Sequence, residues 1–128
     1  DQARFENVAS QFFSDFPAES SNQLMAILSS TEDPDLVSVC LKFLAQVVPY
    51  QIDGISKNEK LTLIVKKTIF HKNTKIRMSI RDIILQLPFT TQSNLVTYLL
   101  PISTTSNYCD DFFIIVTEIA KKTEGRKL

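Results

Sequence analysis

The chain has 128 residues, 44% of them hydrophobic, which is enough for one domain with a buried core. Only two glycines occur, fewer than all-β folds and nucleotide-binding α/β folds usually have at turns and phosphate loops, so the composition favours an all-α fold. The formal net charge is zero, which excludes a global electrostatic attraction to nucleic acid or to an anionic membrane.

Residues 1–17 are expected to form an N-terminal helix that Pro17 ends. The apolar residues on its stripe are Phe5, Val8, Ala9, Phe12, Phe13 and Phe16. We expect this stripe to pack against the helices that follow, because large aromatic side chains are usually buried. Two other interpretations stay open: a docking face for a partner helix, and an oligomerisation element in which Phe5, Phe12 and Phe16 meet a second copy of the chain.

The segment 31–49 has the clearest helical pattern in the chain. Pro34 fixes its own φ and keeps Asp33 out of the helical region, so a helix is expected to begin near Asp35. Pro49 is expected to end that helix. The apolar residues that share one of its faces are Leu36, Val39, Cys40, Phe43, Leu44 and Val47. Such a face requires a neighbouring helix to cover it.

A shorter helix is expected just before this one, from Gln23 to Ser30. Either Ser20 or Ser21 would supply its N-cap, and Ser20 followed by Gln23 has the spacing of a capping box. Two helices joined by a tight turn form an antiparallel pair. We therefore assign residues 18–50 to a first helix pair.

A second pair is expected over residues 56–88, after a linker from Tyr50 to Ile55. Residues 56–59 have the capping-box pattern at its start. Its first helix carries Leu61, Ile64, Val65 and Ile69, and its second helix carries Ile76, Ile80, Ile83, Ile84 and Leu87. A turn at 71–74 separates the two helices, and Pro88 ends the second one.

A third pair is expected over residues 90–123. Thr91 caps its first helix, and Pro101 forces an end or a kink in that helix. The second helix begins near Tyr108 and places on one side Cys109, Phe112, Phe113, Val116, Ile119 and Ala120. Residues 124–128, which include Gly125, are expected to form a frayed basic tail.

The stretch TEDPDLVSVCLKFLAQVV at 31–48 resembles a HEAT or armadillo-type repeat, in which an Asp/Asn-rich turn precedes the second helix. HEAT repeats often carry Arg or Lys just after the apolar residue that opens the second helix. Arg77 matches this feature, whereas Val37 and Cys109 do not. The resemblance spans residues 18–123 and implies an α-solenoid fragment: about three stacked antiparallel helix pairs, here preceded by the N-terminal helix.

The spacing of the second helices agrees with a repeat. They are expected to begin near Leu36, Ile76 and Tyr108, 40 and 32 residues apart, and such a period is typical of helical repeats. An ordinary globular α-bundle is the alternative, because its helices would carry similar apolar stripes.

Basic residues are concentrated in the middle of the chain. Seven of the fourteen lie between Lys60 and Arg81, an interval without an acidic residue. The partner-binding candidates in this basic stripe are Lys66, Lys67, Lys72, Lys75, Arg77 and Arg81. A solvated surface that keeps the chain soluble is the default interpretation. If the stripe binds, an acidic protein segment is favoured over nucleic acid, because only Phe70 and His71 offer ring faces for base stacking.

No enzymatic constellation is present in the sequence. The single histidine, His71, cannot form an HExxH metal site, and its lysine-rich turn disfavours a cation. Cys40 and Cys109 lie on apolar stripes and are expected to be core residues rather than nucleophiles. The adjacent Asp110 and Asp111 point about 100° apart on a helix, so the helix dipole explains them better than a shared metal. We therefore predict no catalytic, cofactor-binding or metal site, and no enzyme.

The remaining signals concern location and partners. Two cysteines without a CxxC spacing favour a reducing compartment, cytoplasmic or nuclear. No apolar run reaches the length of about eighteen residues that a membrane span needs, so a membrane is not an expected partner. We predict a protein–protein interaction or scaffolding module within a larger intracellular protein, with its oligomeric state open.

Overall fold

The computed structural model describes the backbone of residues 2–127 and the side chains of residues 3, 4 and 7–123. Eight α-helices and a short 3-10 helix lie within this part of the chain, and no strand does. The elements are α1 (Gln2–Asp15), α2 (Pro17–Ser30), α3 (Pro34–Val47), η1 (Val48–Tyr50), α4 (Ile52–Ser56), α5 (Leu61–Thr68), α6 (Thr74–Leu85), α7 (Phe89–Ser103) and α8 (Asp110–Lys127). The all-α prediction is confirmed.

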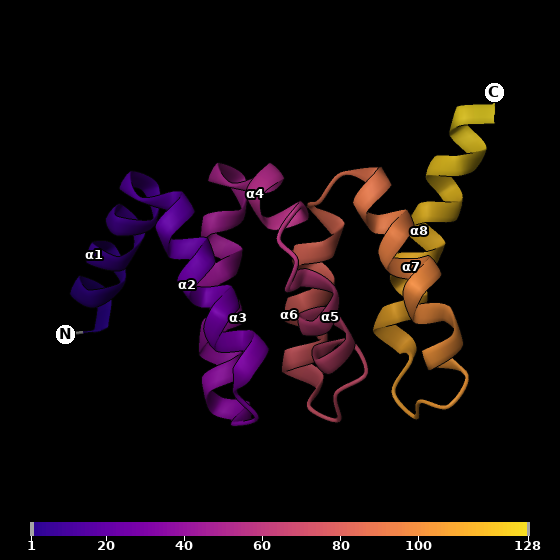
Figure 1. Cartoon of the computed structure of the whole chain (residues 1–128), viewed down its shortest axis with the longest axis horizontal. Helices are drawn as coiled ribbons and strands as arrows, with labels where there is room; N and C mark the ends of the chain where they lie inside the picture. Colours follow the sequence, from indigo (N-terminus) through magenta and orange to yellow (C-terminus); the bar gives the residue numbers. More distant parts are fainter. Residues whose placement is uncertain (1, 128) are drawn as a thin grey trace.

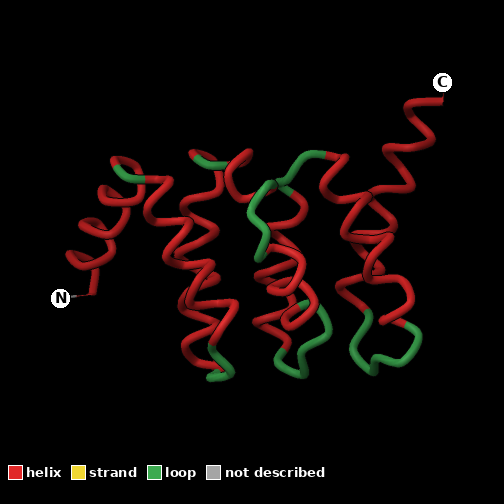
Figure 2. The backbone as a smooth tube through the Cα atoms, viewed as in Figure 1, coloured by secondary structure: helices red, strands yellow, loops and turns green. Residues whose placement is uncertain are grey.

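Successive helix pairs lie side by side along the long axis of the molecule (Figure 1). The first helices of the pairs, α2, α5 and α7, contact one another in series, and the second helices, α3, α6 and α8, do the same. Helix α1 packs on α2 and α3 at one end of the row, and α8 lies at the other end (Figure 1). The row therefore has two layers of helices, and most connections lie along its two edges (Figure 2).

Side-chain caps start two of the second helices. The Asp33 carboxylate accepts a 3.0 Å hydrogen bond from the backbone N–H of Asp35, and α3 begins at Pro34, one residue before the predicted start near Asp35. The Asn73 side chain accepts from two backbone N–H groups in the first turn of α6. Both caps satisfy N–H groups that a helix leaves without an internal partner. The second helices begin at Pro34, Thr74 and Asp110, 40 and 36 residues apart.

The predicted start of α2 is wrong. The helix begins at Pro17 rather than Gln23, because a proline at the first helical position has its φ already set and lacks only an N–H that the helix does not use. Ser20 and Ser21 lie inside the helix instead of capping it. Their hydroxyls donate to backbone carbonyls of the preceding turn, at 2.7 Å and 3.2 Å.

The predicted linker from Tyr50 to Ile55 is also wrong. It begins with the last residue of η1 and includes most of the short helix α4. Ile55 is fully buried, so packing against the rest of the molecule fixes a segment whose local sequence favours a loop. The capping box at 56–59 does not form. Helix α5 begins later, at Leu61, and the side chain of Asn58 accepts from the backbone N–H of Lys60 just before it.

Helix α7 begins at Phe89, so Thr91 is not its cap. The Pro88 carbonyl accepts the first helical hydrogen bond, at 3.0 Å from the N–H of Gln92. Pro101 lies inside the helix, which continues to Ser103. A proline removes one internal hydrogen bond, and only two residues of helix follow it here.

The backbone of α8 continues through Gly125 to Lys127, so the helix does not end at residue 123 as predicted. A glycine ends a helix where it takes a left-handed conformation, and no glycine in the described part of the chain has a positive φ. The side chains of residues 124–128, which form the predicted tail, lie outside those that the structure describes.

The buried face of α3 is rotated from the predicted one. The residues that it buries are Val37, Cys40, Leu41, Leu44 and Val47. Leu36 and Val39, predicted as core, are 40% and 48% exposed. Helix α3 is covered by both α2 and α6, so its buried face is centred between these two neighbours. Apolar spacing identifies the helix but does not show which of its sides the neighbours cover.

The stripe on α1 is only partly buried. Phe13 is buried, whereas Val8, Phe12 and Phe16 are exposed, because α1 is the terminal helix of the row and has neighbours on one side only. The side chain of Phe5 lies outside the described ones. The predicted apolar stripe of α8, at the opposite end, is also only partly buried: Phe112 is fully buried and Phe113 is exposed.

None of the helices within residues 2–127 combines the length and the apolar character that crossing a bilayer requires.

Candidate partner-binding surface

Arg77 of the basic stripe is a buried residue. Its Nε donates to Asp111 Oδ2 at 3.1 Å, and its Nη1 donates to the carbonyl of His71 at 2.6 Å. Its Nη2 donates to Thr74 Oγ1 at 3.2 Å, and the guanidinium lies 5.1 Å from the centre of the Tyr108 ring. These contacts leave little of the guanidinium for an external ligand.

Arg81 contacts the same carboxylate. Its Nη1 donates to Asp111 Oδ1 at 2.9 Å, and its guanidinium also pairs with Asp82 at 2.9 Å. Asp111 is buried, and each of its carboxylate oxygens pairs with one arginine. These two ion pairs join α6 to α8. We call Arg77, Arg81 and Asp111 the Asp111 junction. From the sequence, Asp111 was explained by the helix dipole alone. Two arginines four residues apart on one second helix, followed by an acidic pair at the start of the next second helix, could have predicted this ion-pair junction.

Lys67 binds backbone rather than an external partner. Its Nζ donates to the carbonyls of Leu28 at 3.1 Å and Thr31 at 2.7 Å, and lies 3.4 Å from a Glu32 carboxylate oxygen. Lys67 belongs to the last turn of α5. Its Nζ reaches the carboxyl end of α2, where a cation is favoured and the last carbonyls lack internal partners.

Replacing Lys67 by methionine is expected to lower the free energy of unfolding by roughly 2 kcal/mol, because two carbonyls lose a charged hydrogen-bond donor while the apolar stem is kept. Urea denaturation followed by circular dichroism measures the change. Lys66→Met is the matched control, since Lys66 is the exposed neighbour on α5. An equal loss in both variants would contradict the capping role.

The other three candidates are exposed but lie on different elements. Lys66 is on α5, Lys72 is in the turn before α6, and Lys75 is in the first turn of α6. The structure therefore does not gather the six predicted residues into one continuous surface. Of the exposed three, Lys75 borders a hollow between the second helices.

This hollow, the α3–α6 groove, has a volume of about 370 Å³. It is lined by Ser38, Lys42, Lys75, Met78, Ser79 and Asp82. Met78 is 43% exposed, and its flexible thioether suits a surface that adapts to a partner. Asp82 is paired with Arg81, and Lys75 places an exposed positive charge at the edge of the groove. Sequence reasoning missed Lys42 and Met78, because neither residue belongs to the basic stripe or to an apolar stripe.

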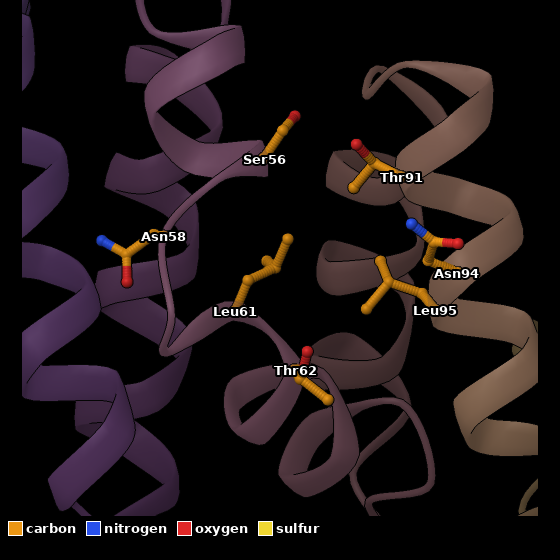
Figure 3. A pocket seen from close by; sticks show the side chains of 7 residues that line it. All are labelled: Ser56, Asn58, Leu61, Thr62, Thr91, Asn94 and Leu95. Carbon is orange, nitrogen blue, oxygen red and sulfur yellow. The ribbon is translucent and has the colours of Figure 1, made fainter.

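A second, smaller cavity of about 180 Å³ lies between the loop before α5 and the first turns of α7 (Figure 3). Its lining residues are Ser56, Asn58, Leu61, Thr62, Thr91, Asn94 and Leu95. The Ser56 hydroxyl is buried and has no hydrogen-bond partner among the described residues. Hydroxyl and amide groups without a titratable side chain suit ordered water rather than acid–base chemistry.

The side chains with reactive groups are separated or occupied. His71 Nδ1 accepts from the backbone N–H of Asn73 at 3.0 Å. Both cysteines are free; burial raises the pKa of the Cys40 thiol, and the Cys109 thiol lies within hydrogen-bond distance of two backbone carbonyls. Within the described residues, no group of three or more His, Cys, Asp or Glu side chains could hold a metal ion.

In comparisons with known proteins, no protein-family model matches the sequence, and neither a curated protein nor a solved structure matches it.

Proposed function

We propose that this chain is a protein-binding scaffold module of the HEAT or armadillo type, and that its α3–α6 groove binds an acidic protein segment. The observation that carries the proposal is the groove between two successive second helices, which exposed Met78 lines together with Lys75 and Lys42. Val39 is also exposed and adds to the apolar surface of α3. Apolar contacts would supply affinity, and the lysines would guide the encounter.

The serial contacts of α2, α5 and α7 in one layer and of α3, α6 and α8 in the other support the solenoid class. In a solenoid each pair buries its face against the next and presents a ridged, rigid surface. Binding without catalysis fits the separated reactive groups, and a reducing compartment, cytoplasmic or nuclear, fits the two free cysteines.

A protein segment fits the groove better than nucleic acid does. Arg77, Arg81 and Lys67 are held in contacts within the chain, which leaves few cations for phosphates. The groove lining contains no aromatic side chain on which a base could stack.

Lys75→Glu is expected to weaken binding of a designed helical peptide with Glu and Leu on one face by at least about tenfold, or about 1.4 kcal/mol. Fluorescence anisotropy with the labelled peptide measures the dissociation constant. Lys66→Glu makes the same charge change on α5 and is expected to leave binding nearly unchanged. Equal weakening by both variants, or equal binding of a peptide with Lys in place of Glu, would contradict a specific groove site.

Self-association is a second candidate function. Phe12 on α1 and Phe16, between α1 and α2, are each 49% exposed, and their ring centroids lie 5.1 Å apart, so they form one aromatic patch. Such a patch suits pairing with a second copy. Sedimentation at high protein concentration tests it, and a monomer under those conditions would exclude it.

A further inference from the structure

The outer side of α8 carries an apolar stripe that the fold leaves uncovered. A shallow hollow of about 390 Å³ runs along it and is lined by Asp110, Phe113, Ile114, Thr117 and Glu118. Phe113 is 52% exposed and Ile114 is 41% exposed. The spacing is that of a single helical face, and α8 lies at one end of the row of helices that the structure describes (Figure 1).

One acidic residue lies at each end of this apolar stripe. Asp110 and Glu118 are eight residues apart, which on a helix is about 12 Å or just over two turns. Asp110 forms no ion pair with any residue that the structure describes. Among the residues whose side chains the structure describes, Glu118 pairs with the exposed Lys121 alone, at 3.4 Å, and a solvated pair of this kind is weak enough to exchange for a partner's cation.

We infer that this α8 face binds an amphipathic, basic helix of a partner protein. Aliphatic side chains of the partner contact Phe113 and Ile114, and two Lys or Arg side chains about two turns apart pair with Asp110 and Glu118. The chemistry is opposite to that of the α3–α6 groove, which carries lysines, so this site stands independently of the function proposed above. The two surfaces together would join an acidic and a basic segment.

Other occupants match the α8 face less well. An acidic segment or an anionic membrane would meet the two carboxylates. A second copy could offer its aromatic patch, but Phe16 in that patch is flanked by Asp15 and Glu19. These carboxylates would repel Asp110 and Glu118 on the α8 face.

The probe is a labelled synthetic peptide, about four turns long, with Leu on one face and Lys at two positions bracketing it. A second peptide carries Glu in place of Lys. Anisotropy with the whole chain is expected to show binding of the Lys peptide, weakened at least about tenfold for the Glu peptide. Phe113→Ser and Glu118→Lys are each expected to weaken the Lys peptide by a similar factor, with the circular dichroism spectrum unchanged.

Matched controls separate this site from general effects. Phe12→Ser removes a comparably exposed phenylalanine from α1, and Glu59→Lys makes the same charge change before α5; both are expected to leave binding unchanged. Lys75→Glu is also expected to leave it unchanged, so failure of this site and failure of the α3–α6 groove are distinguishable. The inference is overturned if both peptides bind alike, if neither binds, if the controls weaken binding equally, or if Phe113→Ser instead abolishes a dimer of the chain.

Discussion

Replacing Asp111 by alanine is expected to lower the free energy of unfolding by about 3 to 5 kcal/mol, the usual effect of removing one member of a buried ion pair. The carboxylate is buried and accepts from Arg77 at 3.1 Å and from Arg81 at 2.9 Å. Without it, the Arg77 guanidinium stays buried with its charge uncompensated. Chemical denaturation followed by circular dichroism measures the loss.

Asp110→Ala provides the control for this experiment. Asp110 precedes Asp111 in the first turn of α8, is exposed, and makes no ion pair with a described residue. Its loss removes only a favourable interaction with the helix N-terminus, at most about 1 kcal/mol. Similar losses for the two variants would show that the Asp111 junction does not hold α6 to α8.

Replacing Phe112 by alanine is expected to cost about 3 to 5 kcal/mol, because a fully buried ring is removed and the surrounding core closes only partly. The Phe112 ring packs on Phe70 with their centroids 5.4 Å apart, and thus ties α8 to the segment between α5 and α6. A domain of this size has about 5 to 15 kcal/mol of stability in all, so the thermal midpoint should fall sharply. Differential scanning calorimetry measures that midpoint.

Phe113→Ala is the neighbouring control, since its ring is 52% exposed. Surface substitutions of this kind usually change stability by within about 0.5 kcal/mol. If Phe113→Ala destabilised the chain as much as Phe112→Ala, the assignment of Phe112 to the core and of Phe113 to a free face would be wrong. The same pair also separates stability from the binding role inferred for Phe113.

Much of the helical framework could be predicted from local signals. Pro34 beside Asp33 fixes the start of α3, and the repeated isoleucines of α6 are all buried, because proline sterics and apolar spacing act within a few residues. The predicted helix boundaries were wrong where two local signals competed. At α2, the capping pattern of Ser20 suggested a later start than Pro17, and the proline set the first turn.

The candidate site was less predictable than the fold. A run of like charges in the sequence does not tell which cations the fold will use internally, and Arg77, Arg81 and Lys67 find their partners 30 to 39 residues away. Lys75 is the only predicted residue that borders the α3–α6 groove, and Met78 joins it from the exposed side of the same helix.

The sequence by itself determined that this chain is helical, where most helices lie, and that its charge is polarised while its sum is zero. The tertiary structure alone decided which apolar residues are buried and which basic residues stay exposed. The reason is physical: helical periodicity is set by hydrogen bonds within four residues, whereas burial and ion pairing depend on helices far apart in the sequence. Val39 and Phe113 show this, because each fits an apolar stripe and neither has a neighbouring helix to cover it.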